Sequence, residues 1–306
     1  MRSTFYTVIV AASALALAGC SPSRGDARQL SAAQVGVESL LEAPDQYYFG
    51  DGVGIRYRII GEGDPVLLLH GYTDRIEMWA GTADSLAKDF RVIVPDLRGF
   101  GLSTKFGDPA QYGGKMVEDL VGLLDYLDVR ETHVMGYSMG AMLTARLALE
   151  HRGRVRTAAF VAGPFFPDSA AAARVFEPYA AAQERGEGLG PFFRWILPTW
   201  SDSAMNAMVP EFQAANDSAS LVASLRALPR LMLDSTRLAR ARVPALAIVS
   251  VKDPMLPRSR FVARWWPNTR LVELPRGDHA DIFLAPELVV EFRDLVRRAT
   301  SPEEKR

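Results

Sequence analysis

The sequence predicts an α/β protein in which a mostly parallel sheet is flanked by helices. Short apolar runs rich in Val, Leu and Ile recur along the chain and are followed by helical patterns, an alternation typical of a largely parallel sheet. Some runs, such as residues 66–69, are apolar at every position, as expected of strands that are buried on both faces. The chain of 306 residues, 48% of them hydrophobic, is long enough to bury such a core.

Seven segments are expected to form strands because each is a short apolar run bounded by turn residues such as Gly, Pro or Asp. They are Ile55–Ile60, Val66–His70, Val92–Pro95, His133–Tyr137, Ala158–Ala162, Ala245–Val251 and Leu271–Leu274. We expect a sheet of at most eight strands.

Between about residues 164 and 236 this alternation stops, which predicts an inserted helical cap. Prolines punctuate helical stretches there, without an apolar run like those on either side. The core is therefore expected to comprise residues 46–163 and 237–306. Aromatic side chains of the cap are candidates to line a substrate pocket, although packing the cap on the core is the simpler role for any one of them. They are Phe165, Phe166, Phe176, Tyr179, Phe192, Phe193, Trp195, Trp200 and Phe212.

The first residues predict export from the cytoplasm. Arg2 supplies a positive charge, residues 8–17 form an apolar run, and small residues follow up to Cys20. This pattern is typical of a secretory signal peptide, and its apolar run is shorter than the roughly 20 residues of a membrane-spanning helix. We expect residues 1–19 to be the signal peptide and residues 20–45, rich in small and polar residues, to form a flexible tether.

The end of this signal, Leu17-Ala18-Gly19-Cys20, resembles the bacterial lipobox, in which cleavage precedes a cysteine that becomes lipid-modified. Cys20 is the one cysteine in the chain, so no internal disulfide can form. The resemblance implies a lipid such as palmitate on Cys20 and a membrane anchor in the cell envelope. Ser21 at the next position favours the outer membrane over the inner one. The alternative is an ordinary secretory signal with cleavage elsewhere and an unused thiol.

The nearly balanced charge excludes partners held by bulk electrostatics. Lys and Arg number 35 and Asp and Glu 36, so the formal net charge is -1. No field is available to hold nucleic acid or an anionic surface, and we expect no nucleic-acid partner. The sequence leaves the oligomeric state open.

The strongest chemical signal is Gly136-Tyr137-Ser138-Met139-Gly140, which follows a predicted strand and precedes a run of helix formers. A strand-to-helix bend of this kind strains the serine backbone, and the flanking glycines prevent collisions with neighbouring chain. Ser138 is therefore the candidate nucleophile. Its position at the start of a helix favours negative charge there.

Two backbone N–H groups are candidates for an oxyanion hole. Met139 follows the nucleophile directly, so its N–H would be one donor. The pair His70-Gly71 ends another predicted strand, and the N–H of Tyr72 would be the second donor. We expect the side chain of His70 to be structural.

Activation of a serine requires a base, and His279 is the best candidate among the four histidines. His70 ends a strand, His133 begins another and His151 ends a helix. His279 instead lies in a loop after the last predicted strand, where the carboxyl edge of an α/β sheet gathers functional groups.

Asp253 is the preferred acid of the triad because it directly follows the preceding strand segment. Asp278 is a rival by sequence, but adjacent loop residues rarely direct a carboxylate at the neighbouring imidazole. Asp96 and Asp281 are further rivals for which structural roles are expected. The chain order Ser, Asp, His is the one that a single serine-hydrolase fold uses.

With these motifs the chain resembles the α/β-hydrolase superfamily over about residues 46–298. The resemblance rests on His70-Gly71, on the elbow motif around Ser138, and on residues 95–103 (PDLRGFGLS). It points to the capped branch that holds esterases, enol-lactonases, haloperoxidase-like enzymes, carbon–carbon bond hydrolases and epoxide hydrolases. The sequence departs from many relatives in having Ser250 and Ala141 where glycines are common, which removes no catalytic group.

The resemblance also bears on chemistry. An aspartate at the elbow would imply epoxide hydrolase or haloalkane dehalogenase activity, whereas Ser138 makes an acyl-enzyme the natural intermediate. In residues 95–103 we expect Asp96 and Arg98 to be paired or hydrogen-bonded and to fix this loop near the active site.

The sequence therefore predicts an enzyme that hydrolyses a carboxylic ester or lactone with an apolar moiety, without a cofactor or metal. Carbon–carbon bond hydrolysis and acyl transfer are alternatives that would use the same triad. A catalytically silent lipoprotein that binds an apolar ligand is an alternative of a different class.

Overall fold

The computed structural model describes residues 39–300 and contains one eight-stranded sheet, which confirms the predicted fold class. The strand order is β1-β2-β4-β3-β5-β6-β7-β8. β2 pairs antiparallel with β1 and β4, and every other pair is parallel. The strands are β1 (Gln46–Gly50), β2 (Val53–Ile60), β3 (Asp64–Leu69), β4 (Phe90–Pro95), β5 (Thr132–Tyr137), β6 (Val155–Val161), β7 (Ala245–Ser250) and β8 (Thr269–Leu274).

The edge strand β1 was not predicted from the sequence. Its residues alternate between half-buried and exposed, with Tyr47 and Phe49 turned to solvent. An edge strand of this kind carries no continuous apolar run, so its pattern is weaker than that of a strand buried on both faces.

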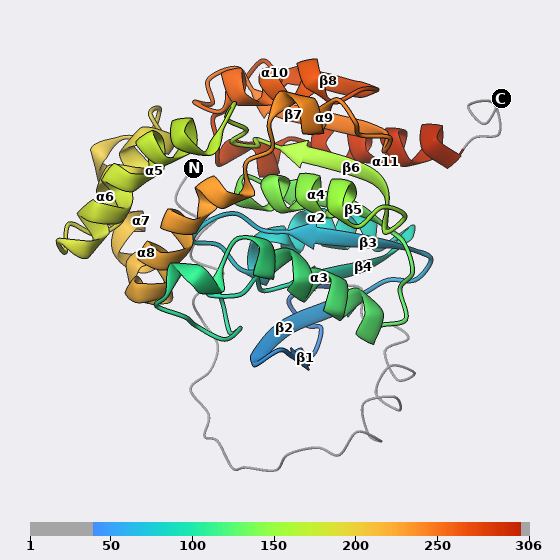
Figure 1. Cartoon of the computed structure of the whole chain (residues 1–306), viewed down its shortest axis with the longest axis horizontal. Helices are drawn as coiled ribbons and strands as arrows, with labels where there is room; N and C mark the ends of the chain where they lie inside the picture. The colour runs from blue at the N-terminus through green and yellow to red at the C-terminus, as the bar shows by residue number, and fades with distance from the viewer. Residues whose placement is uncertain (1–38, 301–306) are drawn as a thin grey trace, which may run out of the picture.

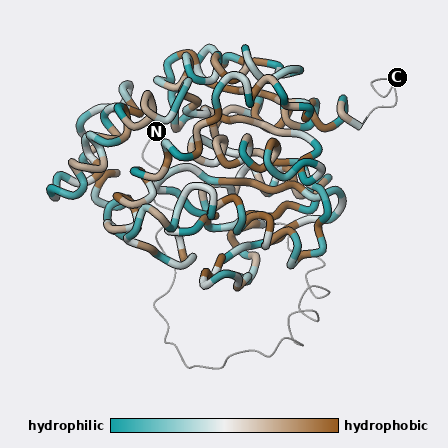
Figure 2. The backbone as a smooth tube through the Cα atoms, in the orientation of Figure 1, coloured by the Kyte–Doolittle hydropathy of each residue, from teal (hydrophilic) through white to brown (hydrophobic). Residues whose placement is uncertain are grey.

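Both faces of the sheet are covered, and β3 illustrates why. Leu67 and Leu69 belong to one core cluster, while Val66 and Leu68 belong to the cluster on the opposite face. Because successive side chains of a strand point to opposite faces, a strand that is apolar throughout must be covered twice. Figure 2 shows hydrophobic colour along the central strands and more hydrophilic colour on the outer helices.

Helices α3, α4 and α10 contribute to the first of these clusters, and α2 and α11 contribute to the second. In α11 the buried residues Leu288, Phe292, Leu295 and Val296 recur at the spacing of one helix face. The bounds are α2 (Ala80–Leu86), α3 (Gly114–Tyr126), α4 (Met139–Glu150), α10 (Leu256–Trp265) and α11 (Glu287–Thr300), with short helices η1 (Ile76–Trp79), η2 (Pro109–Gln111) and η4 (Asp281–Leu284).

Between β6 and β7, all the secondary-structure elements of the described chain are helices. Figure 1 shows α5 to α8 grouped on the side to which the arrow of β6 points, at the carboxyl edge of the sheet. Asp168, Ser201 and Asp217 start α5, α7 and α8 by accepting a backbone N–H of the first turn. The bounds are α5 (Ser169–Glu184), α6 (Gly190–Ile196), α7 (Asp202–Ala215), α8 (Ser218–Ala227), η3 (Leu228–Leu231) and α9 (Ser235–Leu238).

The folded body begins before residue 46. Leu40 is fully buried, and its N–H donates to Asp84 Oδ1 at 2.7 Å. Asp45 Oδ1 lies 2.6 Å from Arg58 Nε and 2.8 Å from Arg56 Nε. The expected tether boundary at residue 45 therefore falls inside the body, because polar contacts of a few residues with distant segments leave no local pattern.

The predicted signal peptide and Cys20 lie outside the described residues. Within residues 39–300, no helix combines the length and the apolar character needed to span a membrane.

Leu40→Ala is expected to lower the free energy of unfolding by about 2–5 kcal/mol because it empties a buried site. Urea denaturation of the full chain measures the change. Leu41→Ala is the matched control: the neighbouring side chain is 42% exposed, so a change within about 0.5 kcal/mol is expected. Equal effects of the two variants would mean that this segment does not pack on the body.

Candidate active site

Ser138 lies at a strained bend between β5 and α4. Its backbone has φ 50° and ψ -114°, and its N–H donates to Val161 O at 2.8 Å. A residue other than glycine in this region costs about 1–3 kcal/mol, which the surrounding structure must offset. The bend is the expected strand-to-helix turn, and it places a half-buried serine at the start of a helix.

The two glycines of the motif allow the close packing behind this bend. A Cβ at Gly136 would lie 2.1 Å from Gly140 O, and a Cβ at Gly140 would lie 2.2 Å from Leu69 O and 2.8 Å from His70 O. The start of α4 therefore touches the end of β3. This contact brings the residues after β3 close to Ser138.

His279 and Asp253, the candidate base and acid, are joined by a hydrogen bond. His279 Nδ1 lies 2.9 Å from Asp253 Oδ2, and both side chains are buried. Since a carboxylate can only accept, Nδ1 carries the proton and Nε2 keeps a free lone pair. Asp253 is itself fixed by the N–H of Met255, which donates to Oδ1 at 2.7 Å.

The imidazole of His279 lies beside the nucleophile strand. Its ring packs on the ring of Tyr137 with centroids 4.9 Å apart, and Tyr137 OH donates to His279 O at 3.2 Å. Tyr137 immediately precedes Ser138 in the chain. The structure therefore gathers the base, its carboxylate and the residue next to the candidate nucleophile.

The rival acids have other partners. Asp278 accepts hydrogen bonds from Thr199 Oγ1 and from the N–H of Ala280. Asp96 lies in a separate network, described below. Asp281 begins the short helix η4.

The loop after β3 carries the candidate oxyanion donor Tyr72. A Cβ at Gly71 would lie 2.8 Å from the ring of Tyr137, so this loop packs directly against the elbow strand. Within residues 39–300, neither the N–H of Tyr72 nor that of Met139 donates to a backbone carbonyl outside the regular helices and strands, so both remain candidates for the oxyanion hole.

His70 holds this loop, in agreement with its expected structural role. The N–H of Leu97 donates to His70 Nε2 at 2.8 Å, so Nδ1 carries the ring proton and donates to Gly71 O at 2.7 Å. Burial lowers the pKa of His70, which keeps the ring neutral.

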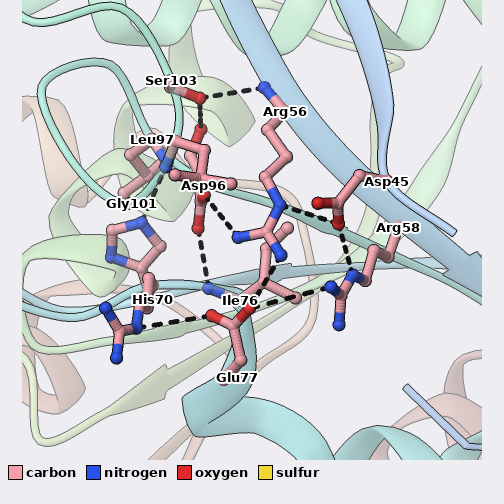
Figure 3. A network of polar contacts seen from close by, with 12 residues as sticks. Asp45, Arg56, Arg58, His70, Ile76, Glu77, Asp96, Leu97, Gly101 and Ser103 are labelled. Atoms are coloured by element: carbon pink, nitrogen blue, oxygen red, sulfur yellow. Dashed lines mark hydrogen bonds and ion pairs between the residues drawn. The ribbon is translucent and has the colours of Figure 1, made fainter. Parts of the chain in front are cut away.

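Asp96 links the loops after β3 and β4 (Figure 3). Its Oδ1 accepts from the N–H of Ile76 at 2.8 Å, and its Oδ2 accepts from the N–H of Leu102 at 2.7 Å and from Arg56 at 3.0 Å. Burial alone would lower the pKa of Arg56, but Asp96 and Glu77 raise it above its ordinary value. The guanidinium therefore remains charged between its carboxylate partners.

Asp96 and Arg98 do not pair with each other. Arg98 forms a bidentate pair with Asp119 in α3, with both N–O distances at 2.6 Å. The two residues are each hydrogen-bonded and fix the loop as expected, through different partners. Asp119 was not foreseen because it lies 21 positions further along the chain.

Asp74, in the candidate oxyanion loop, is a further residue of the site that was not predicted from the sequence. Its Oδ2 would be 2.9 Å from a Cβ at Gly71, and its N–H donates to Gly71 O at 3.4 Å. Burial raises the pKa of Asp74 to about 7, although the charges of His279 and Arg75 act in the opposite direction. The one signal in the sequence that could have identified Asp74 is its position in a loop that follows a predicted strand, at the carboxyl edge of the sheet.

Many cap aromatics pack on one another. Tyr179 stacks on Trp195 with centroids 5.2 Å apart, and Phe193 meets Phe212 at 5.2 Å. Phe192 instead contacts the ring of Tyr72 at 5.1 Å, which joins the helices between β6 and β7 to the loop of this candidate oxyanion donor. Among the described residues, no group of three or more His, Cys, Asp or Glu side chains could hold a metal ion.

Comparison with known proteins agrees with the fold. Residues 64–187 match the alpha/beta hydrolase fold family. The chain is 30% identical over 258 residues to the protein named "Putative carbamate hydrolase RutD" of Azorhizobium caulinodans, an alignment that covers 80% of this chain and 96% of that protein.

Solved structures share the fold at lower identity. The enol-lactonase from Burkholderia xenovorans LB400 aligns with a TM-score of 0.70 and 22% identity over 82% of this chain and all of that one. A thermophilic esterase from Thermogutta terrifontis aligns with a TM-score of 0.73 and 24% identity over 85% of this chain and all of that one.

Asp74→Asn is expected to stabilise the protein more at pH 8 than at pH 5. The pKa of Asp74 is about 7 in the fold against an ordinary value of 3.8, so the folded state binds more protons and loses stability as pH rises between these values. Asparagine mimics the neutral acid. Because the side chain is partly exposed, we expect the gain to grow by about 1–2 kcal/mol between the two pH values.

Urea denaturation at both pH values measures this change. Asp128→Asn, at an exposed surface position, is the control and is expected to shift stability by the same small amount at both. A gain from Asp74→Asn that does not depend on pH would contradict the raised pKa.

Proposed function

Because the chain belongs to the alpha/beta hydrolase fold family, we propose that this enzyme is a serine hydrolase that cleaves a carboxylic ester or lactone. The observation that carries the proposal is the 2.9 Å bond from His279 Nδ1 to Asp253, on an imidazole that packs against the residue before Ser138. A carboxylate-oriented imidazole that packs on the residue preceding a serine at a strained bend fits the arrangement of an activated nucleophile.

In the proposed acylation, Ser138 Oγ attacks the substrate carbonyl carbon while His279 Nε2 accepts the hydroxyl proton. Nε2 is the available base because Nδ1 donates to Asp253, whose charge stabilises the imidazolium that forms. The N–H groups of Tyr72 and Met139 donate to the oxyanion. His279 then gives its proton to the leaving oxygen, and the acyl group stays on Ser138.

In the proposed deacylation, His279 takes a proton from water, and the hydroxide attacks the acyl carbon. Collapse of the second tetrahedral intermediate releases the acid, and the proton returns to Ser138 Oγ. An acyltransferase would use another alcohol or thiol in place of water, and a carbon–carbon hydrolase would release a carbon leaving group. The similarity of fold to an esterase and an enol-lactonase supports the ester or lactone reading.

The apolar part of the substrate is proposed to contact the cap. Phe192 and Trp195 meet at 5.8 Å, and Phe192 contacts the Tyr72 ring, so a chain of aromatic contacts continues toward the proposed oxyanion loop. Aromatic side chains offer large apolar contact area for such a moiety.

Ser138→Ala is expected to abolish labelling by a fluorophosphonate and to lower kcat for p-nitrophenyl esters by about 10³-fold or more, because it removes the nucleophile. The full chain is assayed with short and long acyl chains, so that the same experiment ranks substrates. Asp253→Asn, which favours the wrong imidazole tautomer, should reduce kcat by about 10⁴-fold.

Ser203→Ala is the matched control, since Ser203 lies exposed in α7. It should label and turn over as the unaltered protein does. Folded protein that neither labels nor hydrolyses any ester would overturn the proposal.

We further propose that Cys20 carries the lipid that holds the enzyme at a bacterial membrane. Ser21 at the next position favours the outer membrane over the inner one. The support is the lipobox-like ending at residues 17–20 and the single cysteine of the chain. The full chain expressed in a Gram-negative cell should fractionate with membranes and carry the mass of a diacylglycerol and an acyl chain. Cys20→Ser should remove both properties, and membrane association that survives this change would contradict a lipid anchor.

A further inference from the structure

Two consecutive residues of the loop that carries His279 form hydrogen bonds with two different parts of the chain. Asp253, after β7, holds the imidazole of His279. Thr199, between α6 and α7, donates from Oγ1 to Asp278 Oδ2. Residues 164–236 thus reach the histidine loop through a residue adjacent to the proposed base.

The Asp278 carboxylate is an unusual place for a cap contact because none of its surface is exposed. A buried carboxylate is costly unless donors satisfy its oxygens. Oδ1 accepts from the N–H of Ala280 at 3.2 Å, which ties the carboxylate to the backbone on the far side of His279. Oδ2 has the Thr199 hydroxyl as its donor, so the cap completes the shell of this carboxylate.

The same helical segment holds the oxyanion loop. Tyr72 OH donates to Leu221 O in α8 at 3.2 Å. Asn216, at the end of α7, donates from Nδ2 to Thr73 O at 3.0 Å. The cap therefore contacts both loops that flank Ser138.

We propose that the Thr199–Asp278 hydrogen bond is a positioning contact through which the cap sets the orientation of His279. It rests on the proposed function in that His279 serves as the base. Thr199 and Asp278 are positioning residues: loss of the hydroxyl leaves Asp278 Oδ2 buried without its donor and frees the backbone that bears the imidazole. The orienting partners of active-site groups act on rate in this way without touching substrate.

Thr199→Val tests the proposal because valine keeps the shape and removes the hydroxyl. Thr199 is exposed, so the variant should fold. We expect kcat for the preferred ester to fall about tenfold with KM changed less than about threefold. Thr199→Ser, which restores the hydroxyl, should recover most of the rate.

Thr236→Val is the matched control. Thr236 Oγ1 also donates to an aspartate, Asp234 Oδ1 at 2.6 Å, at an exposed site in the first turn of α9. It should leave kcat and KM unchanged. A loss of rate equal to that of Thr199→Val would show that any weakened Thr–Asp contact in this segment has the same effect, and would overturn the positioning role.

A second readout does not depend on activity. In protein labelled with ¹⁵N on histidine, the Nδ1–H proton of His279, held by Asp253, should give a downfield signal protected from exchange with water. The signal should broaden or vanish in Thr199→Val and persist in Thr199→Ser and Thr236→Val. An unchanged signal together with unchanged kcat would overturn the proposal.

The two readouts separate this proposal from the proposed function. If the unaltered protein hydrolyses no ester, the serine-hydrolase proposal fails, whereas the ¹⁵N signal still decides whether Thr199 orders the histidine. If esters are hydrolysed and Thr199→Val changes only KM, the contact serves substrate binding and the positioning role is wrong.

Discussion

The buried carboxylate of Asp96 is the constraint on which the candidate active site depends. It accepts from the N–H of Ile76, from the N–H of Leu102 and from Arg56, which belong to the loop after β3, the loop after β4 and β2. Such a group is tolerated inside a protein only while its donors stay in place. The loop that bears Tyr72 therefore cannot shift without breaking charged hydrogen bonds, and His70 adds a neutral tie to the same loop.

The fixed position of this loop helps to hold the strained backbone of Ser138 in place. Ser138 adopts a positive φ because Gly140 lets α4 start against the carbonyls at the end of β3, where a Cβ would clash. The end of β3 is in turn fixed by the loop network around Asp96. A parallel sheet places the ends of β3, β5, β7 and β8 at one edge, so the four loops meet there. The order and direction of the strands therefore determine where the site residues lie, and the individual side chains then fix the details.

The parts of this architecture that repeat locally could be predicted. Strands buried on both faces leave continuous apolar runs, and the Ser138 bend requires glycines at fixed spacing, so both are visible in sequence. Contacts between distant residues were not. Arg98 pairs with Asp119 and Asp96 with Arg56, and no local pattern distinguishes these from the neighbouring pair Asp96–Arg98. Leu40 was assigned to the tether for the same reason, and Asp74 was missed because its environment, not its spacing, alters its pKa.

Contacts between distant residues also join the cap to the loops around Ser138. Thr199 lies 79 positions from Asp278, and Tyr72 lies 149 positions from Leu221, so an insertion read as a separate helical unit shares hydrogen bonds with both loops around Ser138. One of these bonds ends on the buried carboxylate of Asp278, which is costly to leave without a donor, and the other joins Tyr72 to a main-chain carbonyl of α8. A change in the cap that moves the Thr199 donor or the Leu221 acceptor therefore alters the loop of His279 or the loop of Tyr72 as well as the packing of the cap aromatics. On this view, the inserted helices complete the support of the candidate catalytic residues, and the sheet alone does not supply it.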